Sequence, residues 1–347
     1  MKPLSYLIVL LMTISSACKQ ETSSSLTWGN LPDIPDAVGF AGSFAGISNN
    51  TLIVAGGANF PDGGAPWTGS KKVWDDQVFA LEKGSQEWKI VGKLPRPLGY
   101  GVSISTDDGL LIIGGSNEEG HYGNVYLLRY AGDSLSYSEL PSLPEPLANS
   151  AGVLLNNTVY VIGGTTDPAS KEAEGNFWSL DLNDLDAGWA IRESWPGPSR
   201  MLSVAGADDH AVYLFSGAHL KDGVREYLSD SYRFSEENGW EKLAELPRAV
   251  VAAPTPAFTD GSSNLLVFGG DDGSLAGIDP QKEEHPGFSK DVLSFDPAKN
   301  EWSTIAEQPG NAAVTTSLVV WNGEVVIPGG EIKPAVRTTQ VRTVVEK

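Results

Sequence analysis

Six short apolar runs, spread along the whole chain, each end in a pair of small residues. Consecutive pairs are 49 to 60 residues apart. A self-similar period of about 50 residues indicates an array of one repeated supersecondary unit, because a single unit cannot bury its apolar face alone. The pairs are Gly56-Gly57, Gly114-Gly115, Gly163-Gly164, Ser216-Gly217, Gly269-Gly270 and Gly329-Gly330.

A second mark accompanies every repeat. A tryptophan or tyrosine stands seven residues before a proline. Together, the glycine pair and the aromatic residue resemble the kelch repeat, whose period is about 50 residues, and each kelch repeat implies one four-stranded blade of a β-propeller. The aromatic and proline positions are Trp28 and Pro35, Trp88 and Pro95, Tyr137 and Pro144, Trp189 and Pro196, Trp240 and Pro247, and Trp302 and Pro309.

We expect the apolar runs to form the second strand of each blade, since short runs rich in β-branched and aromatic residues are typical of buried strands. The glycines would let neighbouring blades approach closely. The repeat aromatic would lie on the outermost strand and fill the wedge between blades, and the proline would end that strand. The expected second strands are residues 52–55, 110–113, 159–162, 212–215, 265–268 and 325–328.

The two ends of the chain predict how the ring of blades closes. Trp28 comes before the first glycine pair, and no aromatic residue follows the last pair, Gly329-Gly330. The N-terminal segment therefore supplies the outermost strand of a blade whose other three strands come from the C-terminus. The sequence predicts one all-β domain, a six-bladed kelch propeller over residues 26–347, with no free sheet edge.

Residues 1–17 have the pattern of a secretory signal peptide: Lys2, an apolar stretch over 4–14, and small residues before Cys18. The stretch is too short to span a membrane. Small residues before the only cysteine resemble the bacterial lipobox, which implies that Cys18 is lipidated and that residues 18–25 are a tether. We expect a periplasmic or outer-membrane lipoprotein of a Gram-negative bacterium, touching the membrane only through this lipid. The alternative is an ordinary signal peptide with an incidental cysteine.

The charge balance excludes several classes of partner. The chain has 44 acidic and 24 basic residues, for a formal net charge of −20. This argues against nucleic acid, whose phosphates need clustered Lys and Arg, and against a polybasic membrane contact. The four histidines lack the spacing of a metal site, and the glycine pairs lack the Lys-Ser/Thr of a P-loop. We therefore expect no metal and no cofactor, and an anionic ligand would need a few local arginines.

Propeller geometry brings two sets of loops onto one face around the central channel: those after the glycine pairs and those after the prolines. Long loops on a rigid scaffold often carry binding sites, and 58–87 and 271–301 are the two longest stretches between a glycine pair and the next repeat aromatic. Each candidate residue has a second reading, as a solvated or packing side chain. The candidates after glycine pairs are Asn59, Phe60, Trp67, His219, Asp271, Glu331 and Arg337. Those after the prolines are Phe40, Phe44, Arg96, Tyr100, Arg200 and Arg248.

The last of these loops resembles a segment of a known family. Residues 330–338 read Gly-Glu-Ile-Lys-Pro-Ala-Val-Arg-Thr, similar to the Gly-Glu-x-Lys-Pro-x-x-Arg-Thr segment of the sialic acid mutarotases, the N-acetylneuraminate epimerases. Residues 44–58 and 100–115 resemble other segments of that family. In typical bacterial members those two segments lie near the C-terminus and the glutamate segment lies mid-chain. The chain therefore resembles a cyclically permuted branch of the family, and a closed ring of blades tolerates such a permutation.

The resemblance implies an isomerase that interconverts the α and β anomers of N-acetylneuraminic acid, a small acidic sugar. It places the general base on Glu331. It gives Arg337 the role of binding the substrate carboxylate, which an arginine fork matches bidentately. The proton donor to the ring oxygen would be water or protonated Glu331, and no cofactor is required. Further substrate-binding candidates are Arg200, Arg96, Asn59, Phe60 and Tyr100.

Two other classes of function stay open at the level of the sequence. Kelch propellers often present loops to partners, so the chain could be a non-catalytic glycan- or protein-binding lipoprotein. A glutamate and an arginine would also serve an epimerase or lactonase that acts on another acidic sugar. The sequence carries no signal for an oligomeric state.

Overall fold

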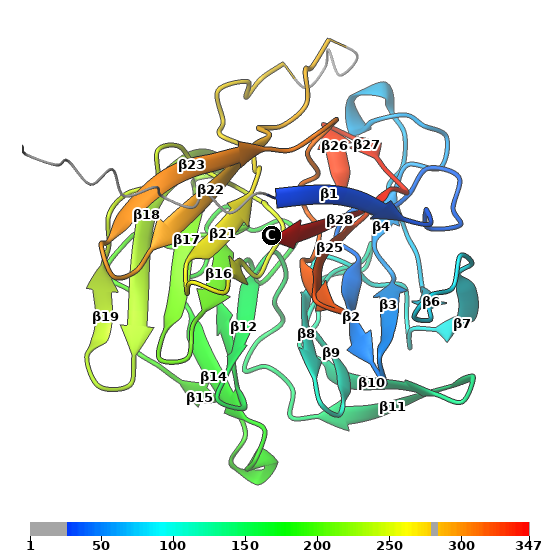
Figure 1. Cartoon of the computed structure of the whole chain (residues 1–347), viewed down its shortest axis with the longest axis horizontal. Helices are drawn as coiled ribbons and strands as arrows, with labels where there is room; N and C mark the ends of the chain where they lie inside the picture. The colour runs from blue at the N-terminus through cyan, green and yellow to red at the C-terminus, as the bar shows by residue number, and fades with distance from the viewer. Residues whose placement is uncertain (1–25, 279–283, 347) are drawn as a thin grey trace, which may run out of the picture.

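The computed structural model describes residues 26–278 and 284–346. The predicted signal peptide, Cys18 and the tether lie outside these residues. Six four-stranded antiparallel sheets are arranged around a central axis (Figure 1). This arrangement confirms the predicted all-β, six-bladed propeller.

Each blade runs outward from the axis through four strands, and its second strand coincides with a predicted apolar run. The innermost strands are β2 (Phe44–Ser48), β8 (Val102–Thr106), β12 (Ala151–Leu155), β16 (Val204–Ala207), β20 (Phe258–Thr259) and β24 (Val319–Trp321). The second strands are β3 (Thr51–Ala55), β9 (Gly109–Ile113), β13 (Thr158–Ile162), β17 (Val212–Lys221), β21 (Leu265–Phe268) and β25 (Glu324–Pro328). The third strands are β6 (Gln77–Leu81), β10 (Val125–Ala131), β14 (Phe177–Asp181), β18 (Val224–Ser235), β22 (Asp291–Asp296) and β28 (Val341–Glu346). The outermost strands are β7 (Lys89–Lys93), β11 (Ser134–Leu140), β15 (Ala190–Ile191), β19 (Gly239–Lys242), β23 (Glu301–Glu307) and β1 (Leu26–Leu31).

Little else in the described part of the chain is regular. Two short ladders lie outside the blades, β4 (Ala58–Asn59) with β5 (Val73–Trp74) and β26 (Glu331–Lys333) with β27 (Val336–Arg337). The described helical segments are the 3-10 turns η1 (Pro66–Thr68) and η2 (Leu185–Ala187). In residues 26–278 and 284–346, accordingly, no helix has the length and apolar character needed to cross a bilayer.

Strands from opposite ends of the chain close the ring. β1 pairs antiparallel with β28 over all six of its residues (Figure 1). Trp28 on β1 packs edge-to-face on Phe268 of the fifth blade, with 6.1 Å between the ring centroids. The closure predicted from the two ends is therefore confirmed. The last blade is built jointly by the two termini of the propeller.

The repeat aromatics join neighbouring blades from the outside. Five of the six donate a side-chain hydrogen bond of 2.8–3.1 Å to a backbone carbonyl of the preceding blade. Such a ring contributes both apolar burial and a directional bond. The donor and acceptor residues are Trp88 and Pro32, Tyr137 and Lys93, Trp189 and Pro141, Trp240 and Glu193, and Trp302 and Ala244.

The paired small residues lie where consecutive blades meet. All twelve have a positive φ between 54° and 111°, a region that glycine adopts without steric cost. In four pairs the second glycine donates a 2.8 Å backbone hydrogen bond to the segment that leads into the next blade. These bonds confirm that the pairs allow close approach between blades. They join Gly57 to Leu98, Gly115 to Leu147, Gly164 to Arg200, and Gly330 to Phe40.

A closed circle of backbone hydrogen bonds surrounds the central channel. One residue per blade, just before the innermost strand, donates its N–H to the carbonyl of the equivalent residue in the preceding blade, at 2.6–2.8 Å. All six residues have φ between 54° and 67°. We call this circle the backbone ring. Its members are Gly42, Tyr100, Asn149, Leu202, Ala252 and Thr315.

A matched pair of glycine variants tests the contact between blades. A Cβ on Gly114 would lie 2.5 Å from the carbonyl oxygen of Leu147 in the next blade, whereas a Cβ on Gly84 would meet nothing within 4 Å. Both glycines have positive φ. Gly84→Ala should therefore cost only the left-handed strain of about 1 kcal/mol, and Gly114→Ala about 3 kcal/mol, because the blades must also separate. Urea unfolding of both variants measures this difference, and equal losses would contradict it.

Candidate active site

The sixth glycine pair is followed directly by a short hairpin on the channel face. Glu331 begins β26, and its backbone exchanges two 2.9 Å hydrogen bonds with Val314, which leads into the same blade. Arg337 on β27 lies opposite Glu331 in the register of this ladder. At the turn, Ala335 has φ 61° and donates its N–H to Oε1 of Glu331 at 2.6 Å. The hairpin thus brings the glutamate and the arginine together and fixes the carboxylate.

Arg337 is packed between the sixth and first blades. Its Nη1 lies 3.0 Å from Oε1 of Glu331, an ion pair without the alignment of a hydrogen bond. Its Nε donates to the carbonyl of Ala58 at 3.3 Å, and its guanidinium lies 5.2 Å from the ring centroid of Phe60. The Arg337 side chain is 4% exposed and that of Glu331 20%. Both described contacts of the carboxylate fall on Oε1, so Oε2 is left for proton transfer.

A cavity of about 680 Å³ opens above the backbone ring and is bordered by Glu331 and Arg337. This volume falls in the range of small-molecule sites. A second hollow of about 410 Å³ shares Glu331, Thr315 and Arg225 with the first. Glu331 therefore lies where the two hollows meet. Other residues that line the larger cavity are Phe60, Trp67, Lys72, Trp74, Tyr100, Asn117, His121, Asn149, Thr165 and Asp167.

Two cations of the larger cavity were not among the sequence candidates. Lys72 places its ammonium 4.9 Å from the ring centroid of Tyr100 and 5.7 Å from that of Trp74. Arg225 is exposed on β18 and lines both hollows. The sequence feature that could have pointed to Lys72 was the unusual length of the stretch 58–87, in which it lies. Arg225 had no such signal, because β17 and β18 continue beyond the blade as one hairpin instead of ending at the glycine pair.

His121 adds a neutral polar group to the cavity wall. Its Nε2 lies 3.1 Å from Oγ1 of Thr165, which also accepts a 3.3 Å hydrogen bond from Asn149. Burial lowers the pKa of His121, so the imidazole is neutral at pH 7. A neutral imidazole and a hydroxyl suit hydrogen bonding to sugar hydroxyls. No group of three or more His, Cys, Asp or Glu side chains suited to a metal occurs in the described ranges.

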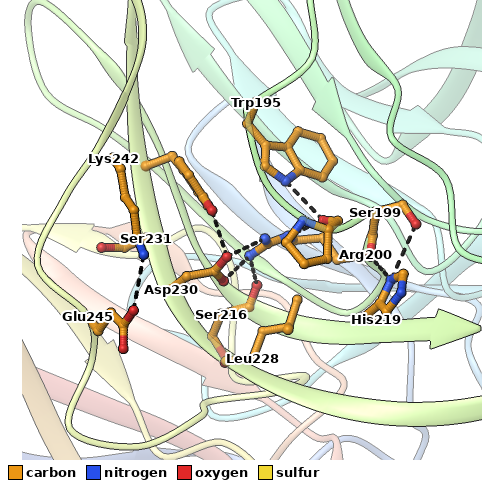
Figure 2. A network of polar contacts seen from close by, with 12 residues as sticks. Trp195, Ser199, Arg200, Ser216, His219, Leu228, Asp230, Ser231, Lys242 and Glu245 are labelled. Atoms are coloured by element: carbon orange, nitrogen blue, oxygen red, sulfur yellow. Dashed lines mark hydrogen bonds and ion pairs between the residues drawn. The ribbon is translucent and has the colours of Figure 1, made fainter.

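Arg200 is not on the cavity wall, contrary to its predicted role in substrate binding. Figure 2 shows its guanidinium facing Asp230 inside the fourth blade, and the two bonds measure 2.7 and 2.9 Å. A third bond of 2.9 Å goes to the carbonyl of Ser216, and the side chain is fully buried. The rings of Trp195 and Tyr232 flank it at 5.3 and 5.4 Å. Because its guanidinium is bonded to Asp230 and Ser216 inside the fourth blade, Arg200 stabilises that blade and is not available to a ligand.

The other predicted substrate-binding residues fall into two groups, those that line the cavity and those that do not. Phe60 and Tyr100 line the cavity. Asn59 is buried in β4 and does not line it. Arg96 stacks on Tyr122 at 4.2 Å and also lies outside the lining. The described structure thus gathers Glu331, Arg337, Phe60 and Tyr100 and leaves out Arg96, Asn59 and Arg200.

The structural role of Arg200 can be tested by removing its charge. Arg200→Met should lower the free energy of unfolding by about 3–5 kcal/mol, because it leaves the Asp230 carboxylate buried and unpaired. Arg192→Met, which breaks a more exposed pair with Glu236, is the control and should cost at most about 1 kcal/mol. Urea unfolding at pH 7 compares the two. A smaller loss for the Arg200 variant than for the control would refute this role.

Arg200→Met should also change how the stability of the fold depends on pH. Burial acts to raise the pKa of Asp230, but the hydrogen bonds and charge of Arg200 outweigh it and hold that pKa below its usual value. A carboxyl with a depressed folded-state pKa stabilises the fold above its unfolded pKa of about 3.9. That contribution is lost as the pH falls through the folded value. Below about pH 4, the stability of the unsubstituted protein should therefore fall more steeply than that of Arg200→Met.

Comparison with known proteins gives this arrangement a family context. The sequence model of the N-acetylneuraminate epimerase family matches residues 11–137 and 140–277. The N-acetylneuraminate epimerase of Haemophilus influenzae (strain PittEE) is 30% identical over 223 residues, covering 58% of this chain and 57% of that protein. The chain thus spans just over half the length of that relative. The enzyme of the same name from Yersinia pestis (strain Pestoides F) is 43% identical over 109 residues, 27% of either chain.

A solved structure agrees with the fold. The structure of YjhT superposes with a TM-score of 0.67 at 18% identity, covering 90% of this chain and 95% of that one. At this level of identity the likeness shows the fold, a second line of agreement with the six-bladed propeller. The family match extends over most of the sequence. The chain therefore belongs to the N-acetylneuraminate epimerase family.

Proposed function

We propose that this protein is a sialic acid mutarotase, which interconverts the α and β anomers of N-acetylneuraminic acid. Family membership supports the reaction, and the Glu331–Arg337 pair supports the site. The observation that carries the proposal is a fixed carboxylate on the cavity wall with one oxygen uncommitted. A binding module does not need a carboxylate oxygen that is left to accept a proton, whereas catalysis by a general base does.

The reaction needs one proton removed and one delivered. Oε2 of Glu331 takes the proton of the anomeric hydroxyl while the bond from the anomeric carbon to the ring oxygen breaks and the ring oxygen gains a proton. The product of this step is the open-chain ketone. Rotation about the bond next to the carbonyl exposes its other face, and the reverse proton transfers close the ring as the other anomer. Protonated Glu331 or water supplies the proton to the ring oxygen.

Arg337 acts on this step through Glu331. Its Nε donates to the carbonyl of Ala58, its Nη1 lies 3.0 Å from Oε1 of Glu331, and 4% of its side chain is exposed. The ion pair holds the carboxylate in one orientation, so that Oε2 does not have to be ordered when the sugar binds. The Arg337 guanidinium is therefore paired with Glu331 and supports the base.

A rotated order of the repeats would divide a match to the family into separate parts. The family match falls in two parts, residues 11–137 and 140–277, and the Haemophilus match covers 58% of this chain. A collinear alignment must be divided where the order of segments changes, and residues 44–115 lie within the first part of the match. We propose that the chain carries the family's repeats in a rotated order, which leaves the circular order of the blades unchanged.

The base can be tested with one isosteric substitution. Glu331→Gln should slow the enzyme-dependent exchange of anomers by about 10²–10⁴-fold, because an amide cannot accept the hydroxyl proton. Proton NMR of sugar freshly released as the α anomer by a sialidase follows the exchange. Glu324→Gln in β25 of the same blade is the control and should keep the full rate. Full activity of the Glu331 variant, or no acceleration by the unsubstituted protein, would disprove the proposal.

We also propose that the chain is exported and anchored through a lipid on Cys18, with the sequence pattern of residues 1–18 as support. In a bacterial host the protein should sediment with membranes and incorporate labelled palmitate. Cys18→Ser should remain unlabelled and soluble. Equal labelling of the variant, or recovery of the unsubstituted protein from the cytosol, would rule out this anchor.

A further inference from the structure

The cavity must hold an anion inside a strongly acidic protein. The sugar proposed above carries a carboxylate on its anomeric carbon, while the chain has a formal net charge of −20. The overall field therefore opposes binding, and a local cation must compensate. The described cations of the cavity are Lys72, Arg225 and Arg337. Arg337 is already paired with Glu331, which leaves Lys72 and Arg225 for the ligand.

Lys72 is held in place without losing its charge. Its ammonium lies over the faces of Tyr100 and Trp74, at 4.9 and 5.7 Å from the ring centroids. None of the ion pairs between described side chains includes Lys72. An aromatic face attracts a cation through its quadrupole, but it does not cancel the formal charge as a carboxylate would. The ammonium therefore keeps both its charge and its donors for a ligand.

The rings under Lys72 are themselves anchored. Tyr100 belongs to the backbone ring, and its aromatic side chain packs so closely over Gly42 that a Cβ there would meet it at 2.7 Å. Trp74 lies on β5, which pairs with β4 beside Phe60. Lys72 thus sits on a rigid wall between the first and second blades, facing the same cavity as Glu331.

Arg225 is less suited to this task. It lies exposed on the hairpin of β17 and β18, which extends past the fourth blade. Ordering a long, exposed side chain on binding costs conformational entropy, which weakens the affinity for a ligand. Lys72 is partly buried, so much of that cost is met before the ligand arrives.

We propose that Lys72 binds the substrate carboxylate and that Tyr100 and Trp74 position its ammonium. This inference rests on the proposed mutarotase function. Because the carboxylate is bonded to the anomeric carbon, its capture also determines where the reacting carbon lies relative to Glu331. Lys72 therefore selects for acidic sugars, and Glu331 carries out the proton transfer.

The test compares an acidic sugar with its neutral ester. Lys72→Gln should raise the KM for N-acetylneuraminate by about 10- to 100-fold, as expected for loss of a charge-assisted hydrogen bond, with a smaller effect on kcat. The KM for the methyl ester of the same sugar should change little. Lys71→Gln is the matched control, because Lys71 is exposed and does not line the cavity. Lys72→Arg should restore most of the preference for the acid.

Two readouts separate this inference from the function on which it rests. Anomer exchange is followed by NMR, and calorimetry measures binding of N-acetylneuraminate. If the unsubstituted protein accelerates exchange while Lys72→Gln behaves like Lys71→Gln, or if Arg225→Gln alone removes the acid preference, the role of Lys72 is wrong and the function stands. If the protein binds the sugar through Lys72 without accelerating exchange, the function is wrong and the anion site stands. Absence of any binding overturns both.

Discussion

The backbone ring is the constraint on which the rest of this propeller depends. Each blade contributes one N–H and one carbonyl to it, so no blade completes its bonds until both neighbours are in place. Five of the six members are not glycine and still adopt a positive φ, at about 1–2 kcal/mol each. Such strain persists only where the surroundings over-determine the backbone. The pairing of β1 with β28 and the hydrogen bonds of the repeat aromatics between blades hold the backbone in place from the outside.

The candidate site arises where one repeated position differs in chemistry. The residue after each glycine pair makes a backbone bridge to the segment that leads into the same blade. In sequence order these residues are Ala58, Ser116, Thr165, Ala218, Asp271 and Glu331. The scaffold therefore presents six equivalent positions around one channel. Among the residues that the structure describes, a hairpin returns an arginine onto the carboxylate at Glu331, and the first blade packs Ala58 and Phe60 against that arginine.

Particular residues show how far sequence reasoning reaches. The repeats, the second strands, the closure through Trp28 and the meeting of Glu331 with Arg337 follow from spacing and resemblance, because they depend on local pattern and ring order. Arg200 was misread, since nothing near it in the sequence announces Asp230, its partner on another strand. Lys72 was missed because its aromatic neighbour Tyr100 belongs to the next blade. Contacts between blades are long-range, and a repeat pattern does not encode which side chains they bury.

The sequence by itself therefore determined the number of blades, the order in which they close and the loop that carries the glutamate. These properties depend on periodic apolar runs and small residues, which act within one repeat or between neighbours. Tertiary structure alone decided which arginines are free to meet a ligand, which lysine faces the cavity and which oxygen of Glu331 is uncommitted. Those outcomes depend on burial and on partners in other blades, and they exist only once the ring has closed.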